Sequence, residues 1–365
     1  MIRYIKIDNY RSFVNFKIDF SSINLLLGKN GTGKSTLFAL LADLRQFIQG
    51  KTDISTAFPF DSLTRWQSVS IQSFEISLSY KECEYLYYLE IEFNHDEKKN
   101  RVKKETVLCE EKPIFHAENG RATLYNDAHK EGPEVLMNWL SSGVSVVYER
   151  PDNKKLCAFK RAVDNIIICH PMPLLQHSYP PCPKSRHLNY YAENISEVYV
   201  SILLNNPEKS VRLWQILKEI NPCLSRIFLE DDTEKTLFFE YDHHGVKSSY
   251  SMKEISDGER MLFTLYFLVV MYFDDDFSVF IDEPDNYISL QEINQFVQFV
   301  QDLAGNKKQC VLISHHPHVI DFFALSNGIW LERRSYGATT ISEPPKSDSG
   351  LTYSEIITHG GADEA

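Results

Sequence analysis

One short segment, Gly28 to Ser35, holds the residue types that bind a nucleoside triphosphate. Its glycines allow successive backbone N–H groups to point at a phosphate, its second lysine can reach the β- and γ-phosphate oxygens, and its last hydroxyl can bind Mg²⁺. The expected phosphate-binding residues are Asn30, Gly31, Thr32, Gly33, Lys34, Ser35 and Thr36, with Ser35 also a magnesium ligand. The segment predicts an ATP site with Mg²⁺, and an ordinary glycine turn is the alternative.

Two carboxylates follow an apolar stretch in the second half of the chain. Asp282 and Glu283 come directly after Phe277 to Ile281, which reads as a buried strand. Because open α/β sheets bind ligands at the carboxyl ends of their strands, Asp282 is expected to hold Mg²⁺, directly or through water. Glu283 is expected to orient and deprotonate the attacking water, as a general base does. A strand that ends in solvated acids is the alternative.

Two further polar segments lie next to apolar ones. Ser256 to Glu259 precedes an apolar helix and has the capping-box pattern, with Ser at the N-cap and Glu three residues later. A helix start of this kind also attracts anions, since its free N–H groups lie at the positive end of the helix dipole. His315 follows the apolar strand Cys310 to Ile313 and is a candidate to bond the γ-phosphate; a surface histidine is the alternative.

The elements that must position these residues alternate between strands and helices. Ile23 to Leu27 reads as a buried strand, the glycine segment follows at once, and Thr36 to Phe47 reads as a helix. From Ser256 onwards the order is helix, strand, helix (Leu290 to Leu303) and strand. Such alternation favours a parallel sheet. We therefore expect the N- and C-terminal parts to form one sheet.

The middle of the chain has a different pattern. From about residue 69 to 127, apolar residues recur at every second position, as in antiparallel strands with one solvated face. The other expected elements are a helix near 134–140, a strand at 165–169, a proline-rich loop at 171–183, helices at 195–204 and 210–220, and strands near 226–230, 236–241 and 246–250. The predicted fold class is α/β, with an antiparallel β-subdomain and a helical insertion.

Composition indicates the environment in which the protein works. The 365 residues are 43% hydrophobic and 24% charged, which is typical of a globular protein. The net charge of −12 repels nucleic acid and acidic membranes, so contact with DNA would need a local basic patch. Seven cysteines without a CxxC pair favour reduced thiols and a cytoplasmic location. The N-terminus has no signal-peptide core, and the apolar run Met261 to Phe273 is too short to span a membrane.

Two other groupings carry weaker signals. One is a set of possible zinc ligands whose spacing fits no common site, so that an ordinary loop is favoured. Its members are Cys169, His170, His177, Cys182 and His187. The other is a basic cluster, for which a solvated hairpin tip is favoured over a phosphate-binding patch. Its members are Lys98, Lys99, Arg101, Lys103 and Lys104.

Taken in their order along the chain, the chemical segments resemble the ABC-type ATPases. The matching positions are Gly28 to Ser35, Ser256-Asp257-Gly258-Glu259, Phe280-Ile281-Asp282-Glu283-Pro284, Asp285-Asn286 and Ser314-His315-His316-Pro317. The match is closest to the soluble SMC- and RecF-like branch, which includes the AAA-like ATPases of the OLD type and of other bacterial phage-defence systems. The opening Asn9 to Phe13 also looks like that branch. The resemblance implies a P-loop NTPase with an ABC-ATPase-like head.

The resemblance also implies roles that the residues alone do not give. The signature (Ser256, Asp257, Gly258 and Glu259) would contact ATP bound to a second subunit, so that the ATP-bound state is a head-to-tail homodimer or higher homo-oligomer with composite sites. His315 would be the switch histidine, Asp285 would lie at the dimer seam, and Arg11 would lie on the adenine and ribose side. The signature reads Ser-Asp-Gly-Glu instead of the Ser-Gly-Gly-Gln of transporters. The glutamine-loop residue is not placed by the resemblance, and Gln176, after the strand expected at 165–169, is a guess.

The expected organisation is a single ABC-type ATPase domain over residues 1–365. Its parts are an N-terminal lobe with the P-loop and β-subdomain (1–127), an insertion or helical lobe (128–250), a C-terminal lobe with the signature, the acidic pair and the switch histidine (251–345), and a flexible tail (346–365).

The resulting hypothesis is a dimerising switch ATPase. After His315 there is no room for the Toprim nuclease domain that OLD-type relatives carry, so the effector is expected to be a separate polypeptide, a nuclease or toxin in anti-phage defence. The alternative is a RecF- or SMC-like DNA-repair ATPase that binds DNA directly, against which the acidic charge and the lack of a coiled coil count. A transporter subunit is disfavoured by the signature and the β-rich insertion, and no membrane partner is expected.

Overall fold

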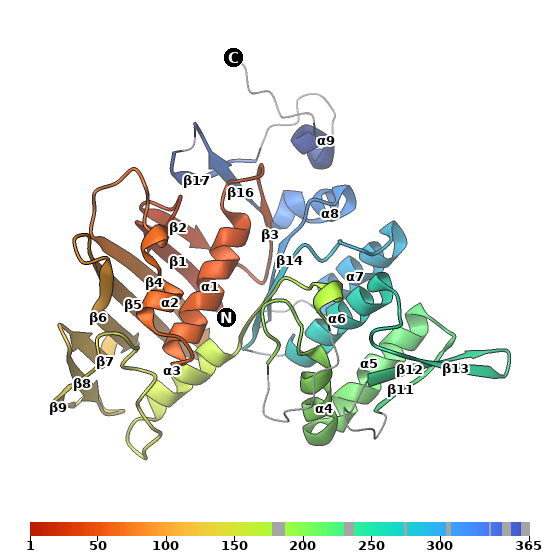
Figure 1. Cartoon of the computed structure of the whole chain (residues 1–365), viewed down its shortest axis with the longest axis horizontal. Helices are drawn as coiled ribbons and strands as arrows, with labels where there is room; N and C mark the ends of the chain where they lie inside the picture. Colours follow the sequence, from red (N-terminus) through yellow and green to blue (C-terminus); the bar gives the residue numbers. More distant parts are fainter. Residues whose placement is uncertain are drawn as a thin grey trace.

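Three sheets organise the protein in the computed structural model, which describes residues 1–176, 187–229, 237–273, 276–303, 308–335, 337–344 and 352–358 (Figure 1). They have eight, six and three strands. Among the described residues, no helix is both long and apolar enough to cross a membrane.

The six-stranded sheet joins distant parts of the chain. Its order is β10 (Ile166–Cys169), β14 (Ser278–Asp282), β15 (Gln309–Ile313), β3 (Ile23–Leu27), β16 (Gly328–Arg333) and β17 (Thr339–Ser342). The first five strands pair in parallel, and β17 pairs with β16 in the antiparallel sense. The expectation of one sheet shared by the N- and C-terminal parts is confirmed, and a strand from the middle of the chain joins it.

The central strands of this sheet are buried on both faces, which explains their continuous apolar sequences. Leu26, Phe280 and Val311 pack on one side, together with α1 (Lys34–Ile48) and α3 (Lys154–Asp164). Their neighbours along each strand pack on the other side. That second core is covered by α6 (Asp257–Tyr272), α7 (Leu290–Leu303) and α8 (Pro317–Asn327).

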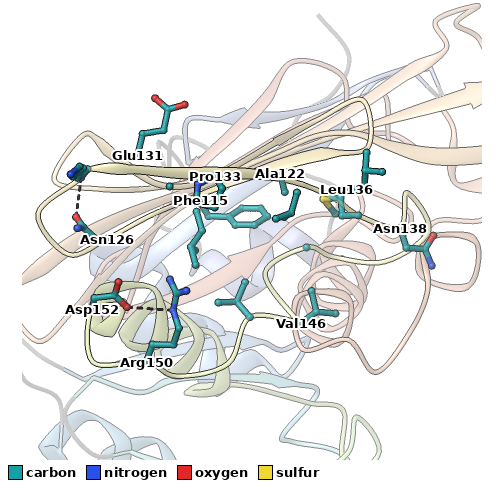
Figure 2. Close-up of a pocket in the computed structure, with 17 residues that line it drawn as sticks. Phe115, Ala122, Asn126, Glu131, Pro133, Leu136, Asn138, Val146, Arg150 and Asp152 are labelled. Atoms are coloured by element: carbon teal, nitrogen blue, oxygen red, sulfur yellow. Dashed lines mark hydrogen bonds and ion pairs between the residues drawn. The ribbon is translucent and has the colours of Figure 1, made fainter.

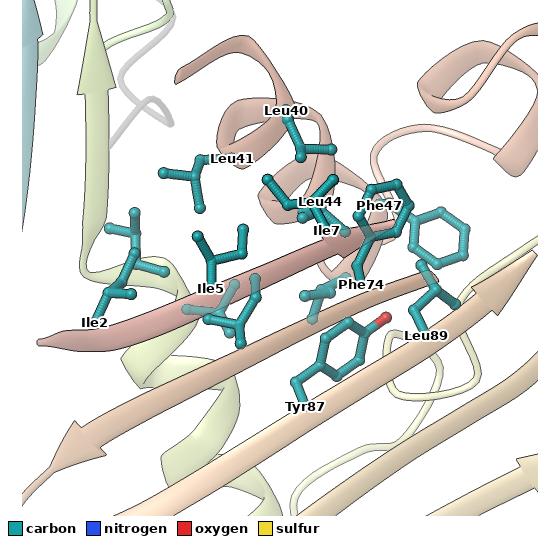
Figure 3. Packing of buried hydrophobic residues seen from close by; sticks show 14 of the residues in the cluster. Ile2, Ile5, Ile7, Leu40, Leu41, Leu44, Phe47, Phe74, Tyr87 and Leu89 are labelled. Atoms are coloured by element: carbon teal, nitrogen blue, oxygen red, sulfur yellow. The ribbon is translucent and has the colours of Figure 1, made fainter. Parts of the chain in front are cut away.

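The eight-stranded sheet is antiparallel throughout. It packs on α1 from the side opposite the six-stranded sheet. Its order is β2 (Phe16–Asp19), β1 (Ile2–Asp8), β4 (Ile71–Tyr80), β5 (Cys83–Asn94), β6 (Lys99–Cys109), β7 (Lys112–Glu118), β8 (Arg121–Tyr125) and β9 (Glu131–Leu136). Figure 3 shows Leu40, Leu44 and Phe47 of α1 facing Ile7 of β1 and Phe74 of β4. The short helix α2 (Ile54–Ala57) lies near the end of α1. The antiparallel pattern expected for residues 69–127 is confirmed.

The second half of the predicted insertion, from α4 to β13, lies at the end of the molecule opposite the large sheet (Figure 1). It contains α4 (Ile195–Asn205), α5 (Pro207–Ile220) and a sheet of β11 (Leu224–Leu229), β12 (Leu237–His243) and β13 (Val246–Ser251). These elements confirm the helices and strands predicted for this region.

One predicted element is wrong. Residues expected to form a helix near 134–140 belong in part to β9, whose Val135 pairs with Ala122 of β8. The apolar residues in this stretch fit a helical period, but Gly132 and Pro133 just before it disfavour a helix interior. Pairing with β8 then decides the conformation.

The tail expectation is corrected for one segment. Within the region expected to be flexible, α9 (Tyr353–Thr358) packs near α8, and Ser354 donates hydrogen bonds from its N–H (2.9 Å) and its hydroxyl (2.8 Å) to the carboxylate of Asp321. Residues 346–351 and 359–365 of the tail lie outside the described part.

The basic cluster lies on the β5–β6 hairpin, as favoured from the sequence. Three of its cations pair with carboxylates: Arg101 with Glu92 at 2.6 Å, Lys103 with Glu90 at 3.7 Å, and Lys99 with Glu97 of the turn at 3.2 Å. Of the possible zinc ligands, His177 and Cys182 lie outside the described residues. Within the described ranges no three His, Cys, Asp or Glu side chains are grouped as a metal site.

A buried carboxyl group links the large sheet to the loop that follows β9. Glu105 of β6 is fully buried and accepts hydrogen bonds from the hydroxyls of Tyr87 (2.9 Å) and Ser142 (2.6 Å) and from the N–H of Gly143 (2.7 Å). Burial raises the pKa of Glu105, and the hydrogen bonds oppose this shift.

This raised pKa predicts a pH-dependent effect of Glu105→Gln on stability. The folded state binds the proton more tightly than the unfolded state, so the contribution of Glu105 is greatest below the ordinary carboxyl pKa and is lost as the pH rises. We expect the free energy of unfolding of wild type to fall relative to that of Glu105→Gln above about pH 4.5, by at most about 1.4 kcal/mol per pH unit. Urea unfolding at several pH values measures this difference, and a difference that stays constant with pH would contradict it.

Candidate functional site

The predicted phosphate loop connects β3 to α1. Gly28, Gly31 and Gly33 all have positive φ values, of 142°, 80° and 102°, which L side chains rarely adopt. Gly33 is the N-cap of α1, and no side chain caps this helix start. The first N–H groups of α1 are thus available to a bound anion, at the positive end of the helix dipole. Asn30, Gly31 and Ser35 are exposed on this loop, and Thr36 is half-buried.

Neighbouring strands leave no space for side chains at two of the glycines. A Cβ on Gly28 would lie 2.2 Å from the carbonyl oxygen of Leu331, and one on Gly33 would lie 2.9 Å from Cζ of Phe13. Both positions therefore require glycine for packing as well as for φ. The loop is held at these two points by β16 and by the segment after β1.

A hydroxyl from the far end of the chain also supports the loop. Thr339 of β17 donates from its hydroxyl to the carbonyl of Thr32 at 2.8 Å, and this hydroxyl lies 2.9 Å from that of Ser12. The N–H of Thr339 donates to the carbonyl of Ser12. Sequence reasoning missed Thr339, because it lies more than 300 residues from the two residues that it joins.

Lys34 lies at the centre of the loop. Its side chain is almost fully buried, and its amine donates to the carbonyls of Gly28 (2.7 Å) and Lys29 (3.2 Å). Burial lowers the pKa of Lys34, while the charges of Asp282 and Glu283 act to raise it. This places the amine within the electrostatic reach of both predicted carboxylates.

The parallel register brings the predicted polar residues to one edge of the sheet. Asp282 pairs with Ile313, and Ile313 pairs with Leu26, so the residues that follow these strands lie in a row. Asp282 is 1% exposed, and its Oδ1 is buried without a hydrogen-bond partner. A buried, unsatisfied carboxylate oxygen is costly unless a cation or donor binds it. Together with the exposed hydroxyl of Ser35, this hard oxygen suits Mg²⁺.

Glu283 turns away from the strand direction. It has a φ of 53°, its N–H donates to the carbonyl of Ile313 (2.8 Å), and its Oε2 accepts from the side chain of Asn286 (2.8 Å). A non-glycine residue held in the left-handed region is a strain that recurs at functional sites. The turn keeps the Glu283 carboxylate half-exposed, whereas Asp282 is buried.

His170, rather than Gln176, lies next to the acidic pair. It follows β10, whose Cys169 pairs with Ile281, and its Nδ1 is 3.5 Å from Oδ2 of Asp282. Contact with Asp282 raises the pKa of His170, against the effect of burial. Gln176 is fully buried and donates to the hydroxyl of Thr264 on α6 at 2.8 Å, so it faces away from this edge. The Gln176 prediction is therefore corrected.

Asp285 lies on the same loop as Glu283, and His315 lies on the loop after the neighbouring strand β15. The His315 side chain is exposed at the carboxyl end of β15, just before the start of α8. Asp285 is half-buried, and its Oδ1 is buried without a hydrogen-bond partner. Both side chains are placed at the edge where the sequence puts them, and their roles stay predictions.

The signature segment begins α6, as predicted. Ser256 is the N-cap, and the capping box is complete: Glu259 N–H donates to the Ser256 hydroxyl (3.2 Å), and Ser256 N–H donates to the Glu259 carboxylate (3.0 Å). Ser256 is exposed, and Asp257, Gly258 and Glu259 are partly exposed. This helix end is accessible from outside the chain, as a contact with a second subunit requires.

Gly258 also connects the signature to the loop after the acidic pair. A Cβ on Gly258 would lie 2.9 Å from the carbonyl oxygen of Tyr287, which has a φ of 71° and is 52% exposed. The 283–287 loop thus lies against the start of α6, and a larger residue at 258 would displace it.

Arg11 lies on the loop between β1 and β2. Its side chain is exposed, its φ is 50°, and its N–H donates to the carbonyl of Ser62 at 2.7 Å. The same loop carries Ser12 and Phe13, which contact the phosphate loop. The motif is thus adjacent to the phosphate loop, and the adenine-side role of Arg11 stays a prediction.

Two cavities lie outside this row of residues. One, of about 770 Å³, is beside the phosphate loop and is lined in part by Gly28, Lys29 and Trp330. The other, of about 510 Å³, lies between β7 to β9 and the following loop (Figure 2). Neither is lined by Lys34 or Asp282.

Comparisons with known proteins agree with this geometry. Residues 1–168, somewhat less than half of the chain, match a family described as AAA ATPase domain. No curated protein matches the chain. Among solved structures, the chain is similar to an SMC head bound to the C-winged helix domain of ScpA, at 13% identity and a TM-score of 0.57, with 93% of this chain and 97% of that chain covered.

Two further SMC heads have lower TM-scores. The head from Thermotoga maritima is 12% identical with a TM-score of 0.48, covering 93% of this chain and 98% of that one. The head with an extended coiled coil, bound to the C-terminal domain of ScpA derived from Pyrococcus furiosus, is 13% identical with a TM-score of 0.47, and the coverage is 98% of each chain. The protein described here has the fold of P-loop ATPases of the SMC-head type, and its phosphate loop lies in the part that matches an AAA ATPase domain.

Proposed function

We propose that this protein binds ATP with Mg²⁺ and hydrolyses it between two copies of the chain. The observation that carries the proposal is the convergence at one sheet edge of an uncapped helix start, the buried Lys34 amine and the buried Asp282 oxygen that lacks a partner. Cationic, anionic and backbone groups arranged in this way match the opposite charges of a magnesium triphosphate.

Each residue has a distinct part in the proposed reaction. The N–H groups at the start of α1 and the Lys34 amine bind the phosphate oxygens and stabilise the charge that develops on them. Ser35 and Asp282 hold the metal, which when bound neutralises phosphate charge. Glu283 accepts the proton of the attacking water on its carboxylate, and His315 donates a hydrogen bond to the γ-phosphate.

The second copy completes the site through its signature. The exposed start of α6, with Ser256 at its N-cap, presents free N–H groups to a neighbour's triphosphate. Two such contacts related by a twofold axis close a dimer. Hydrolysis removes the γ-phosphate that bridges the two chains, so the dimer opens.

The dimer cycle would control a separately encoded effector, a nuclease or toxin, in anti-phage defence in the cytoplasm. The support is the resemblance of the motifs to that group of ATPases, together with free thiols in the described part. The related SMC head whose structure is bound to ScpA is an example of such a head held by a partner protein. Direct DNA binding has less support, because the net charge is −12 and three of the hairpin cations pair with carboxylates.

The direct test is phosphate release by the purified chain with ATP and Mg²⁺, combined with light scattering with and without nucleotide. We expect turnover, and a doubling of mass that requires ATP. Turnover without any change of mass would support an ATPase but contradict a site shared by two chains. Failure to bind ATP would contradict the whole proposal.

Ser256→Arg should separate binding from dimerisation. The larger cation fills the space in front of α6 while the phosphate loop stays intact. We expect ATP affinity within about twofold of wild type, loss of the ATP-dependent dimer, and turnover reduced about 100-fold. The substitution also removes an N-cap, which costs about 1 kcal/mol.

A matched control for that cap loss is Thr352→Arg, at the peripheral helix α9. Thr352 and Glu355 form an equivalent capping arrangement, with the Thr352 N–H donating to Glu355 at 2.8 Å and the Glu355 N–H donating to the Thr352 hydroxyl at 3.3 Å. This control should dimerise with ATP like wild type. If Ser256→Arg also dimerises normally, the signature does not face a second subunit.

A further inference from the structure

His170 has an unusual place beside the acidic pair. Its side chain is 18% exposed, and its Nδ1 lies 3.5 Å from Oδ2 of Asp282, which is itself 1% exposed. Nδ1 of His170 and Oδ1 of Asp282 are both buried without a hydrogen-bond partner. Oδ2 of Asp282 faces His170, whereas Oδ1 has no partner, and a buried polar atom of this kind is unfavourable unless another group binds it.

The imidazole is held firmly in this position. The backbone N–H of His170 donates to the carbonyl of Tyr190 at 2.6 Å, and the N–H of Met172 donates to that of Tyr191 at 3.2 Å. The ring stacks on Tyr190 and meets Tyr191 edge-on, with both ring centroids 6.2 Å away. These contacts orient the ring along the sheet edge towards Asp282.

We propose that His170 is a positioning residue that orients the carboxylate of Asp282 toward the metal of the bound nucleotide. This inference rests on the proposed function. The imidazole Nδ1, 3.5 Å from Oδ2, holds that oxygen on the side of His170, so that Oδ1 is the oxygen presented to the cation. Outer partners of this kind orient the ligands of a metal and govern its affinity.

The strand register explains why His170, far from Asp282 in the sequence, lies beside it. The parallel pairing of Cys169 with Ile281 places the next residue of each strand, His170 and Asp282, side by side. Gln176, the other polar candidate on the same loop, donates instead to Thr264 and is not available. His170, directly after β10, lies beside the Asp282 carboxylate from this side.

The test is the affinity of the ATP-loaded protein for Mn²⁺, which replaces Mg²⁺ and is followed by its electron paramagnetic resonance. His170→Ala should weaken Mn²⁺ binding about 10- to 100-fold, while ATP binding measured in EDTA stays within about twofold of wild type. His170→Gln, which retains a hydrogen-bond donor, should recover part of the Mn²⁺ affinity. His95→Ala, on the β5–β6 turn, is the control and should match wild type.

Each other outcome counts against the inference or against its basis. If His170→Ala binds Mn²⁺ as wild type does, His170 does not position Asp282. If a folded His170→Ala, or His170→Gln where Ala does not fold, loses ATP binding in EDTA as well, the residue contacts the nucleotide or supports the loop instead. If wild type binds no ATP under either condition, the proposed function fails rather than the role of His170.

Discussion

Glu283→Gln should stop ATP turnover and leave an ATP-bound dimer. The substitution keeps the size of the side chain and an oxygen that can accept from Asn286, as Glu283 does at 2.8 Å, but it removes the group that takes the proton from water. General-base catalysis contributes about 100- to 10,000-fold, so we expect a loss of turnover in that range with little change in ATP affinity. Without hydrolysis the bridging γ-phosphate remains, and the dimer persists.

Single-turnover hydrolysis and light scattering measure the two parts of this expectation. Glu97→Gln, at the β5–β6 turn where Glu97 pairs with Lys99, is a matched carboxylate control and should hydrolyse ATP normally. Normal turnover by Glu283→Gln would show that another group is the base. Slow turnover with a monomeric ATP-bound state would support Glu283 as the general base but contradict the expected ATP-bound dimer.

Lys34→Ala should abolish nucleotide binding. The amine is buried and is the cation that the loop offers to the β- and γ-phosphates, and hydrogen bonds to charged groups contribute about 1.5–3 kcal/mol each. Loss of two such bonds weakens ATP binding at least about 100-fold. Isothermal titration with Mg²⁺-ATP measures this change.

The same amine also donates to the carbonyls of Gly28 and Lys29, so its removal can loosen the loop. Thermal unfolding separates the two effects: we expect a small change of midpoint beside the large loss of binding. Lys98→Ala, on the β5–β6 hairpin, is the control for loss of one lysine. ATP affinity retained by a folded Lys34→Ala would mean that the nucleotide does not bind on this loop.

The parts of the fold that the sequence predicts well have strong local patterns. Ile23 to Leu27 followed by three glycines can be recognised as strand and loop from neighbours alone, because burial on both faces and positive φ leave few other residue choices. The period-2 strands between 69 and 127 are equally clear, since one face is buried and the other solvated. The helix predicted at 134–140 is wrong because the apolar spacing of these residues fits a helix, whereas pairing with β8 makes part of the segment a strand.

The predicted site residues are those that lie in contiguous motifs. Lys34 and Asp282 can be found because each lies inside a recognisable strand-and-loop segment. His170 and Thr339 cannot be given a role in this way, because each acts through a contact with a residue far away in the sequence. His170 contacts Asp282, and Thr339 contacts Thr32. A polar residue immediately after the predicted strand at 165–169 was the only available signal, and it marked His170 rather than Gln176.

The close approach of Tyr287 to Gly258 suggests a route by which the proposed hydrolysis would open the proposed dimer. Glu283 and Tyr287 both have positive φ values, so the short loop between them is held in a restricted shape. The Tyr287 carbonyl lies against the start of α6. In the proposed cycle, a change at Glu283 on hydrolysis would alter the surface that the signature presents to the second subunit.

Mixing two inactive variants tests the shared site most directly. Lys34→Ala lacks the loop that binds ATP, and Ser256→Arg lacks the signature that faces it, so each alone should be inactive. In a mixed dimer, one site combines the intact loop of one chain with the intact signature of the other. Equal mixing at concentrations where wild type dimerises should restore up to about a quarter of wild-type turnover. A mixture no more active than its two components, although both fold and Ser256→Arg binds ATP, would contradict the account.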